Sequence, residues 1–218
     1  MKKTEITLDK ILKEYSNYVL EHLEKPKSVY QFAKQLKIEE AQFYEFFSSF
    51  EAIEKQYFKI LFQKTIEVVV KTEEFESYDA KTKLLSLYYT FFGNLTQNRS
   101  LVLYLLENEK NLINISKKLY ILKEDFVSYF KTLDIQPLDF KNETANRYQN
   151  EAVSSIAWTH FLATVNFWLQ DTSSSFEKTD IFIEKSVATS FDLLEITPLK
   201  NILDFGKFLW KEKVHFQN

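Results

Sequence analysis

The stretch VYQFAKQLKIEEAQFYEFF, residues 29–47, decides the fold. Ser28 precedes it and Gln31 follows three positions later, which is the capping-box spacing that starts a helix. A second short helix is expected from about Glu39 to Phe47. The stretch therefore predicts two short helices joined by a tight turn. Apolar residues at helical spacing form the buried face of the first helix: Val29, Phe32, Ala33 and Leu36.

Longer helices are expected on both sides of this pair. Apolar residues recur at three- and four-residue spacing from Ile6 to about Glu24, and Pro26 ends that helix. Either Ser48 or Ser49 is placed to cap a long helix that reaches about Lys71. The first third of the chain is thus expected to hold three short to medium helices and a long connecting helix.

The rest of the chain is expected to be helical as well, with one loop around DIQPLDFKNE, residues 134–143. Ser174 and Glu177 have capping-box spacing, and Thr197 with Pro198 offers a cap and a first-turn proline. The periodicity predicts helices near 79–97, 100–108, 112–132, 145–170, 178–195 and 198–213.

The composition agrees with an all-α protein, because two glycines and three prolines in 218 residues leave few turn formers. The net charge of −3 gives no whole-protein attraction to nucleic acid or anionic lipid, so any polyanion binding must be local. The absence of cysteine excludes disulfides and thiolate metal sites and fits a cytoplasmic location. No stretch approaches the roughly 18 consecutive apolar residues of a membrane span. We expect neither a membrane span nor a signal peptide.

Residues 5–60 carry a known pattern of buried and anchoring positions: Ala33, Leu36, Ile38, Phe43, Tyr44, Phe47, Glu51 and Ile53. At these positions the segment resembles the DNA-binding domain of TetR-type transcriptional regulators. The resemblance implies a three-helix, helix-turn-helix DNA-binding domain at 1–48 and a helical effector-binding and dimerisation domain at 49–218. It also implies a homodimer that binds operator DNA and responds to a small hydrophobic effector.

The surface half of the motif departs from the family pattern. Lys37 replaces the turn glycine, and Phe50 replaces a lysine that contacts phosphate in the family. Glu39 and Glu40 stand where Ser, Thr or a basic residue is usual. Between residues 28 and 54, two lysines against five glutamates give a local net charge of −3. Because phosphate contacts dominate protein–DNA affinity, DNA binding must rest on fewer groups here.

The expected DNA contacts come from three places in the motif. Lysines and Ser28 lie at a helix N-terminus, where backbone N–H groups favour phosphate, and Gln42 can pair with adenine. The alternative interpretation is an ordinary solvated surface. The predicted DNA-binding residues are Lys25, Lys27, Ser28, Lys34, Gln42 and Tyr44.

The C-terminal part is rich in aromatic residues, most of which are expected in the core. The resemblance implies an effector cavity between the middle helices and a dimer built from the helices near 150–170 and 178–195. The candidates for lining the cavity are Tyr88, Phe92, Tyr104, Phe126 and Trp158. The candidates for the dimer interface are Val153, Ile156, Ala157, Phe161, Thr164, Val187, Phe191 and Leu194, with intramolecular packing as the alternative.

Residues 167–213 are also faintly similar to the TetR-fold lipid-binding protein of ubiquinone biosynthesis, at Trp168, Asp171, Ser173 and Asp180. The alternative function is therefore a lipid- or isoprenoid-binding protein of the same fold that has lost DNA binding. Catalysis, metal and cofactors are not expected, because the three histidines lie far apart and two glycines make no phosphate-binding loop. The sequence leaves open the effector, the operator, and whether the protein represses or activates.

Overall fold

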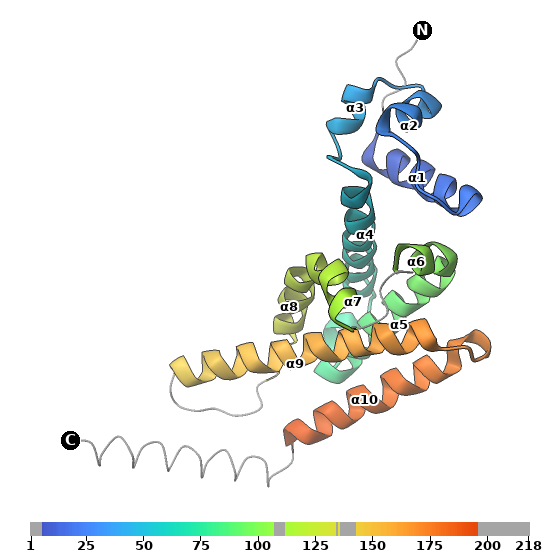
Figure 1. Cartoon of the computed structure of the whole chain (residues 1–218). Coiled ribbons are helices and arrows are strands. Elements are labelled where there is room, and N and C mark those ends of the chain that lie inside the picture. Colours follow the sequence, from blue (N-terminus) through green and yellow to red (C-terminus); the bar gives the residue numbers. More distant parts are fainter. Residues whose placement is uncertain (1–5, 107–111, 134, 136–142, 196–218) are drawn as a thin grey trace. The chain divides into compact units, whose positions relative to one another are not determined.

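A computed structural model describes residues 6–106, 112–133, 135 and 143–195 (Figure 1). Within these ranges every regular element is a helix, which confirms the all-α prediction. None of the described helices is both long enough and apolar enough to cross a membrane. In chain order they are α1 (Leu8–His22), α2 (Val29–Leu36), α3 (Glu40–Tyr44), α4 (Phe50–Val70), η1 (Phe75–Ser77), α5 (Ala80–Gln97), α6 (Arg99–Leu106), α7 (Leu112–Leu119), η2 (Tyr120–Leu122), α8 (Lys123–Thr132), α9 (Glu143–Gln170), η3 (Ser174–Phe176) and α10 (Glu177–Glu195).

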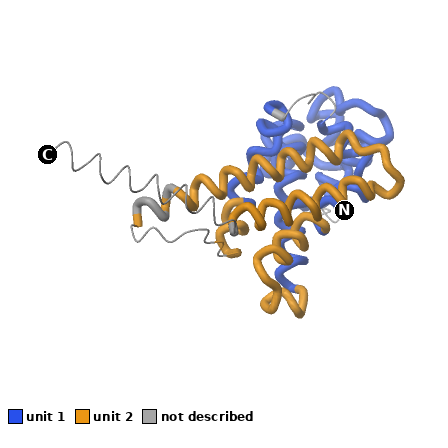
Figure 2. The backbone as a smooth tube through the Cα atoms, turned by 90° about the horizontal axis from the view of Figure 1, so that it is seen from below, with its two compact units in different colours: residues 1–71, 90–126 blue, residues 72–89, 127–218 orange. Residues whose placement is uncertain are grey.

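The helices form two compact units (Figure 2). Unit 1 comprises residues 1–71 and 90–126, and unit 2 comprises residues 72–89 and 127–218. The predicted domain boundary after residue 48 lies inside unit 1, because α4 continues without interruption to Val70.

Helix starts in unit 1 follow the local sequence. The hydroxyls of Thr7, Ser28 and Ser49 each accept a hydrogen bond from the backbone N–H three residues later. Each bond satisfies one of the N–H groups that the first turn of a helix leaves without a partner. The predicted cap at Ser28 is confirmed, and Ser49 rather than Ser48 caps α4.

An aromatic cluster holds α1 to α4 together in unit 1. Phe32, almost fully buried, meets the rings of Tyr15, Phe43 and Phe50 edge to face at centroid distances of 5.7–6.2 Å. Phe50 stacks on Tyr15 at 5.4 Å. These geometries are the favourable ones for aromatic pairs. Position 50 therefore contributes to packing in this chain, where the family pattern places a lysine.

Two helix predictions in the C-terminal part were wrong. The helix expected over 112–132 is divided by the 3-10 turn η2, which no proline or glycine marks in the sequence. Ser174 does not cap α10; instead the Asp171 carboxylate accepts from the backbone N–H and hydroxyl of Thr179 at 2.9 and 2.7 Å. Ser173 accepts from Lys178 N–H at 3.2 Å. The predicted loop at 134–143, apart from Ile135 and from Glu143 at the start of α9, lies outside the described residues, as does the helix at 198–213 with Thr197 and Pro198.

Candidate functional site

The turn between α2 and α3 has the geometry that the quoted stretch predicts. Lys37 has φ 57° and ψ 40°, in the left-handed region. Ile38 N–H donates to Ala33 C=O, and Lys37 N–H donates to Lys34 C=O, both at 3.1 Å. This is a Schellman motif, which normally has glycine at the left-handed position. A lysine there carries a conformational cost of about 1–2 kcal/mol.

Several predicted DNA-binding residues of this helix pair are open to solvent. Lys27, Ser28, Lys34 and Tyr44 are all exposed. The Tyr44 hydroxyl donates to Glu40 Oε1 at 3.3 Å, a bond on the surface that a phosphate oxygen can replace. Tyr30 on α2 is 60% exposed as well.

The other two predicted contacts are partly engaged within the protein. The Lys25 amine lies 3.0 Å from Glu51 Oε1 and 3.1 Å from Glu54 Oε1. Burial alone would lower the pKa of Lys25, but its bonds to the two glutamates outweigh burial and raise it. The side-chain carbonyl of Gln42 accepts from Glu39 N–H at 3.0 Å in a capping box. Gln42 therefore keeps its amide NH₂ and one carbonyl lone pair for a further partner.

Glu54 joins four segments of unit 1. Its side chain is 3% exposed and accepts from the Tyr15 hydroxyl at 2.8 Å. Lys118 on α7 lies 3.1 Å from the second carboxylate oxygen. Burial, followed by the Glu54 charge and hydrogen bond, raises the pKa of Tyr15, so its hydroxyl stays protonated and donates. The carboxylate thus holds α1, the segment before α2, α4 and α7.

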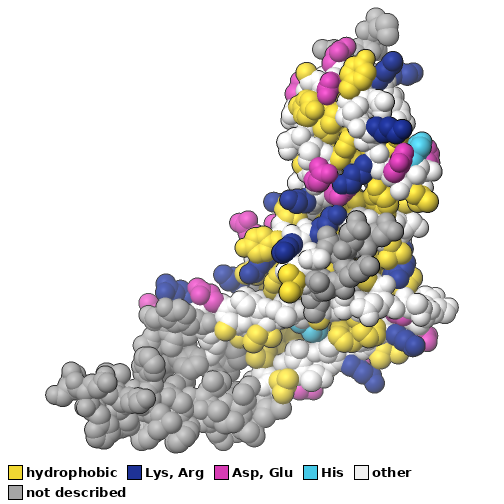
Figure 3. All heavy atoms as spheres, viewed as in Figure 1, with side chains coloured by type: hydrophobic (Ala, Val, Ile, Leu, Met, Phe, Trp, Pro, Cys, Tyr) yellow, Lys and Arg dark blue, Asp and Glu magenta, His cyan; other side chains and the backbone are white. Residues whose placement is uncertain are grey.

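These ion pairs change the charge that the helix pair presents to solvent. Hydrogen bonds from its own backbone N–H, Lys25 and Ser49 lower the pKa of Glu51 to about 2. Lys25 and Lys118 together balance the charges of Glu51 and Glu54. When the balanced charges of Glu51 and Glu54 are left out, residues 28–54 keep two lysines and three glutamates, a net charge of −1. These residues are Lys34, Lys37, Glu39, Glu40 and Glu45. On the described surface seen in Figure 3, basic and acidic side chains are mixed.

Unit 2 contains an apolar cavity of about 240 Å³, here called the inner cavity. Tyr88, a predicted ligand-binding residue, lines it. Six of the eight residues predicted for the dimer interface line it too, and one of them, Ile156, is 69% exposed, so the cavity is partly open to the surface of the unit. Its lining residues are Leu84, Tyr88, Phe130, Ile135, Val153, Ile156, Ala157, His160, Val187, Ser190, Phe191, Leu193 and Leu194.

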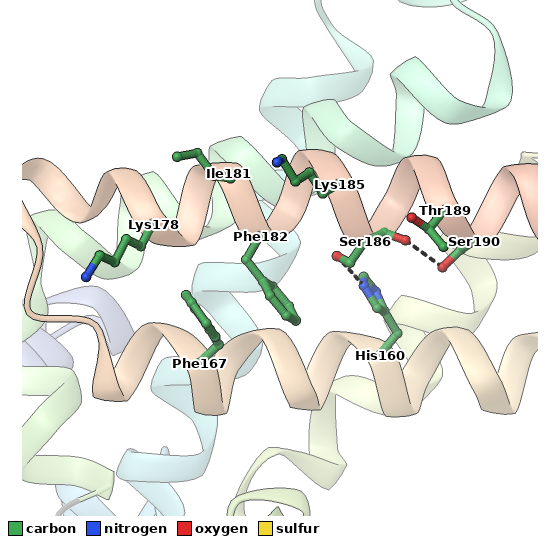
Figure 4. Close-up of a pocket in the computed structure, with 9 residues that line it drawn as sticks. All are labelled: His160, Phe167, Lys178, Ile181, Phe182, Lys185, Ser186, Thr189 and Ser190. Carbon is green, nitrogen blue, oxygen red and sulfur yellow. Dashed lines mark hydrogen bonds between the residues drawn. The ribbon is translucent and has the colours of Figure 1, made fainter.

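A chain of hydrogen bonds passes through one wall of the inner cavity. The Tyr88 hydroxyl lies 2.9 Å from His160 Nδ1. On the other side of the ring, Ser186 Oγ lies 2.7 Å from His160 Nε2, the bond drawn between these two residues in Figure 4. Burial lowers the pKa of His160, so the imidazole is neutral at pH 7. Burial also raises the pKa of Tyr88 well above its usual value. The polar wall of the inner cavity is therefore uncharged at pH 7.

A second hollow, of about 580 Å³, lies between α9 and α10 and is here called the outer groove (Figure 4). His160 lines it as well as the inner cavity. Phe167 and Phe182 stack at 4.4 Å in its wall, beside Ile181, which is 47% exposed. Lys178 and Lys185 add positive charge to its lining. The outer groove is thus apolar with basic groups.

The remaining predicted residues lie elsewhere. Phe92 and Phe126 are buried in unit 1 and Trp158 in unit 2, whereas Tyr104 is half-buried. None of the four lines the inner cavity. Phe161, Thr164 and Val187 of the predicted interface are fully buried inside unit 2, so without repacking they have no surface for a partner.

Comparison with known families gives one match. The model of the tetracyclin repressor-like, C-terminal domain matches residues 83–209. Comparisons with curated proteins and with solved structures gave no match. Within the described ranges no group of three or more His, Asp or Glu side chains is placed to hold a metal ion. Since the family match spans more than half of the chain, the protein belongs to the tetracycline repressor-like (TetR) family.

Proposed function

We propose that this protein is a TetR-type transcriptional regulator that binds operator DNA as a homodimer and responds to a small hydrophobic effector. The observation that carries the proposal is the pair α2 and α3 with its Schellman turn, together with the pairing of Glu51 and Glu54 inside unit 1. That pairing reduces the local negative charge that argued against DNA binding in the sequence. The exposed lysines are then opposed by fewer acidic groups.

The proposed DNA contacts are of two kinds, to phosphates and to a base edge. Lys27 and Ser28 lie at the N-terminus of α2, where backbone N–H groups favour a phosphate, and Lys34 adds a second phosphate contact. Tyr44 exchanges its bond to Glu40 for a phosphate oxygen. Gln42 reads a base edge through its NH₂, while its carbonyl accepts from Glu39 N–H at the start of α3. Lys25 contributes least, because its charge is balanced by Glu51 and Glu54.

The dimer interface uses the surface of α9 and α10. Ile156 is 69% exposed and stays in the proposed interface. Phe167, Ile181 and Phe182 of the outer groove join it, because an exposed apolar surface of this kind is typical of a protein contact. A two-fold dimer places its two reading heads on successive major grooves. An effector that binds one arrangement of the dimer more tightly shifts the population toward that arrangement.

The second candidate is a lipid- or isoprenoid-binding protein of this fold without DNA binding. Glu39, Glu40 and Glu45 favour it, because like charges repel the DNA backbone. The helix pair α2 and α3 with its Schellman turn favours the regulator.

A salt titration separates the two candidates. Fluorescence anisotropy measures the binding of the full chain to random duplexes and to fragments from its own promoter region, from about 50 to 200 mM salt. The regulator binds, and its affinity falls steeply with salt. The double variant Lys27→Gln, Lys34→Gln removes about four phosphate contacts per dimer, so the log–log slope falls by about 3 to 4.

The matched control is the double variant Lys117→Gln, Lys131→Gln, which removes the same charge from exposed positions outside the helix pair. Its slope stays close to that of the unchanged chain. If the chain shows no binding at the lowest salt, the regulator proposal fails and the lipid-binding candidate takes its place. If both double variants lose affinity equally, the contacting surface is assigned wrongly.

A further inference from the structure

Unit 1 contains an open groove of about 400 Å³, here called the α1 groove, which none of the predicted site residues lines. Its lining comes from one face of α1, from one face of α4 and from the start of α6. All of these residues belong to unit 1, whereas the inner cavity and the outer groove are lined by unit 2. The α1 groove is therefore a separate candidate site.

The lining of the α1 groove carries an excess of positive charge. It contains two lysines and one aspartate, a net charge of +1. Lys64 Nζ lies 3.5 Å from Asp9 Oδ1, whereas the exposed Lys13 has no ion pair among the described residues. An anionic group beside Lys13 therefore gains a counter-charge without competing against an acidic side chain for it.

A second observation points to a ligand with acceptor atoms. Tyr57 lines the α1 groove, and its hydroxyl is buried with no hydrogen-bond partner among the described residues. Burial raises the pKa of Tyr57 to about 12, so the hydroxyl keeps its proton at pH 7 and can donate. A buried donor without an acceptor is costly, which is why such groups are rare in folded proteins. A ligand oxygen that accepts from this hydroxyl removes the cost.

The unpaired lysine of α1 and the unpaired tyrosine of α4 lie at the same level of the groove. Asp9 on α1 meets Lys64 on α4, and Tyr15 on α1 meets Glu54 on α4. The two helices therefore run antiparallel. On each helix the unpaired residue lies between these two contacts, so both line the same stretch of the groove and one ligand group can reach both.

The rest of the lining includes apolar side chains from all three helices. Leu12 and Leu101 are buried, Leu61 is half-buried, and Leu20 is 41% exposed. An apolar ligand body that covers these side chains removes apolar surface from water, which is favourable in proportion to the area covered. Because the groove is open, its preference comes from these contacts and not from the exclusion of other molecules.

We propose that the α1 groove binds an amphipathic anion: a molecule with an apolar body and a carboxylate that pairs with Lys13 and accepts a hydrogen bond from Tyr57. The Tyr57 hydroxyl is covered in the structure, so this bond requires the side chain to move toward the groove. The inference goes beyond the proposed function, which places its effector among the C-terminal helices. Binding to the α1 groove is measured on the full chain without DNA.

Two probes of equal length test the inference, octanoate and its uncharged amide, octanamide. Isothermal titration calorimetry measures their affinities for the full chain at low salt. We expect octanoate to bind about threefold more tightly than octanamide, the usual gain from one exposed ion pair. The difference should disappear at high salt, because salt screens exposed charges. Absence of octanoate binding, or equal affinities at low salt, would overturn the inference.

A charge variant locates the carboxylate. Lys13→Gln is expected to lower the affinity for octanoate about threefold and to leave that for octanamide unchanged. The matched control is Lys185→Gln, which removes the same charge from the outer groove and should change neither affinity. An affinity for octanoate that is unchanged in Lys13→Gln, or a loss confined to Lys185→Gln, contradicts the inference.

A second variant tests the hydroxyl. Tyr57→Phe is expected to weaken both probes about fivefold, as the loss of one hydrogen bond gives. Urea denaturation should show no loss of stability in this variant, because the hydroxyl that it removes has no partner in the protein. The matched control is Tyr18→Phe, a half-buried tyrosine of α1 outside the groove. Unchanged binding in Tyr57→Phe, or an equal loss in both variants, contradicts the inference.

The outcome is separable from that of the DNA proposal. A chain that binds octanoate through Lys13 and Tyr57 but binds no DNA refutes the regulator and supports the α1 groove as an anion site. A chain that binds DNA but neither probe refutes the anion site alone.

Discussion

Replacing Glu54 by glutamine tests the network that joins α1, α4 and α7. The variant keeps the size of the side chain and removes its charge. Glu54 is 3% exposed and meets two lysines and the Tyr15 hydroxyl at 2.8–3.1 Å. Removing one member of a buried ion pair typically costs about 3–5 kcal/mol, because its partner is left without a counter-charge.

The loss of stability expected for Glu54→Gln lies below the top of that range. The side chains of Lys25 and Lys118 are 39% and 21% exposed, so both can regain water. Lys25 also keeps Glu51 at 3.0 Å. Two charge-assisted bonds of about 1.5–3 kcal/mol each, reduced by this rehydration, give an expected loss of about 2–4 kcal/mol. That is a large part of the usual 5–15 kcal/mol of a folded protein.

Urea denaturation followed by circular dichroism at 222 nm measures the loss. The matched control is Asp9→Asn, which removes a carboxylate from an exposed pair with Lys64 at 3.5 Å and is expected to cost no more than about 0.5 kcal/mol. A Glu54→Gln variant as stable as Asp9→Asn would refute the network as a source of stability.

Three further predictions concern single residues. Lys37→Gly removes about 1–2 kcal/mol of strain at the left-handed position, and the more flexible unfolded chain takes back about 0.4–1 kcal/mol. Urea denaturation should therefore show a net gain in stability of about 1 kcal/mol. A loss of stability would contradict the strain at Lys37. Burial lowers the pKa of His160 in the folded state, so the unfolded chain binds the proton first and stability falls as pH drops below about 6.5 towards the folded pKa. In urea titrations at each pH, the stability of the His160→Gln variant should fall less over that window than the stability of the unchanged chain. An identical fall in both proteins would mean that another group causes it. Burial alone would raise the pKa of Asp171, but hydrogen bonds from Ser173 and Thr179 outweigh burial and lower this pKa. Asp171→Asn should therefore reduce stability by about 2 kcal/mol at pH 7 and by progressively less below about pH 4. A loss of stability that is constant with pH counts against the ionised cap.

The helix pattern was largely predictable because local signals decide it. Serine caps and apolar periodicity located α1, α2 and α4 to within about two residues, and the left-handed turn at Lys37 followed from the position of the absent glycine. The break at η2 was not predictable, because no helix-breaking residue marks it. At the start of α10, Ser174 was chosen for its capping-box spacing to Glu177, whereas the buried carboxylate of Asp171 reaches across eight residues to Thr179.

The site was less predictable because periodicity shows that a face is apolar but not what lies against it. Val153 and Phe191 were assigned to a dimer interface from such a face, and in the structure they line the partly open inner cavity beside the exposed Ile156, so their place in an interface stays a prediction. The local charge count for residues 28–54 overstated the exposed negative charge for a related reason. It treated Glu54 as a surface charge, whereas its partners Lys25 and Lys118 lie 29 and 64 residues away in the sequence. Pairings at that separation require coordinates.

Selection from fragmented genomic DNA shows directly whether this chain reads operator DNA. The full chain is mixed with the fragments at low salt, and retained fragments are sequenced beside those retained by the Lys27→Gln, Lys34→Gln variant. If the chain reads operator DNA, we expect enrichment of an inverted repeat whose half-sites lie one helical turn, about 34–36 Å, apart or a multiple of it. Retained DNA without such a repeat, or the same enrichment with the double variant, contradicts it.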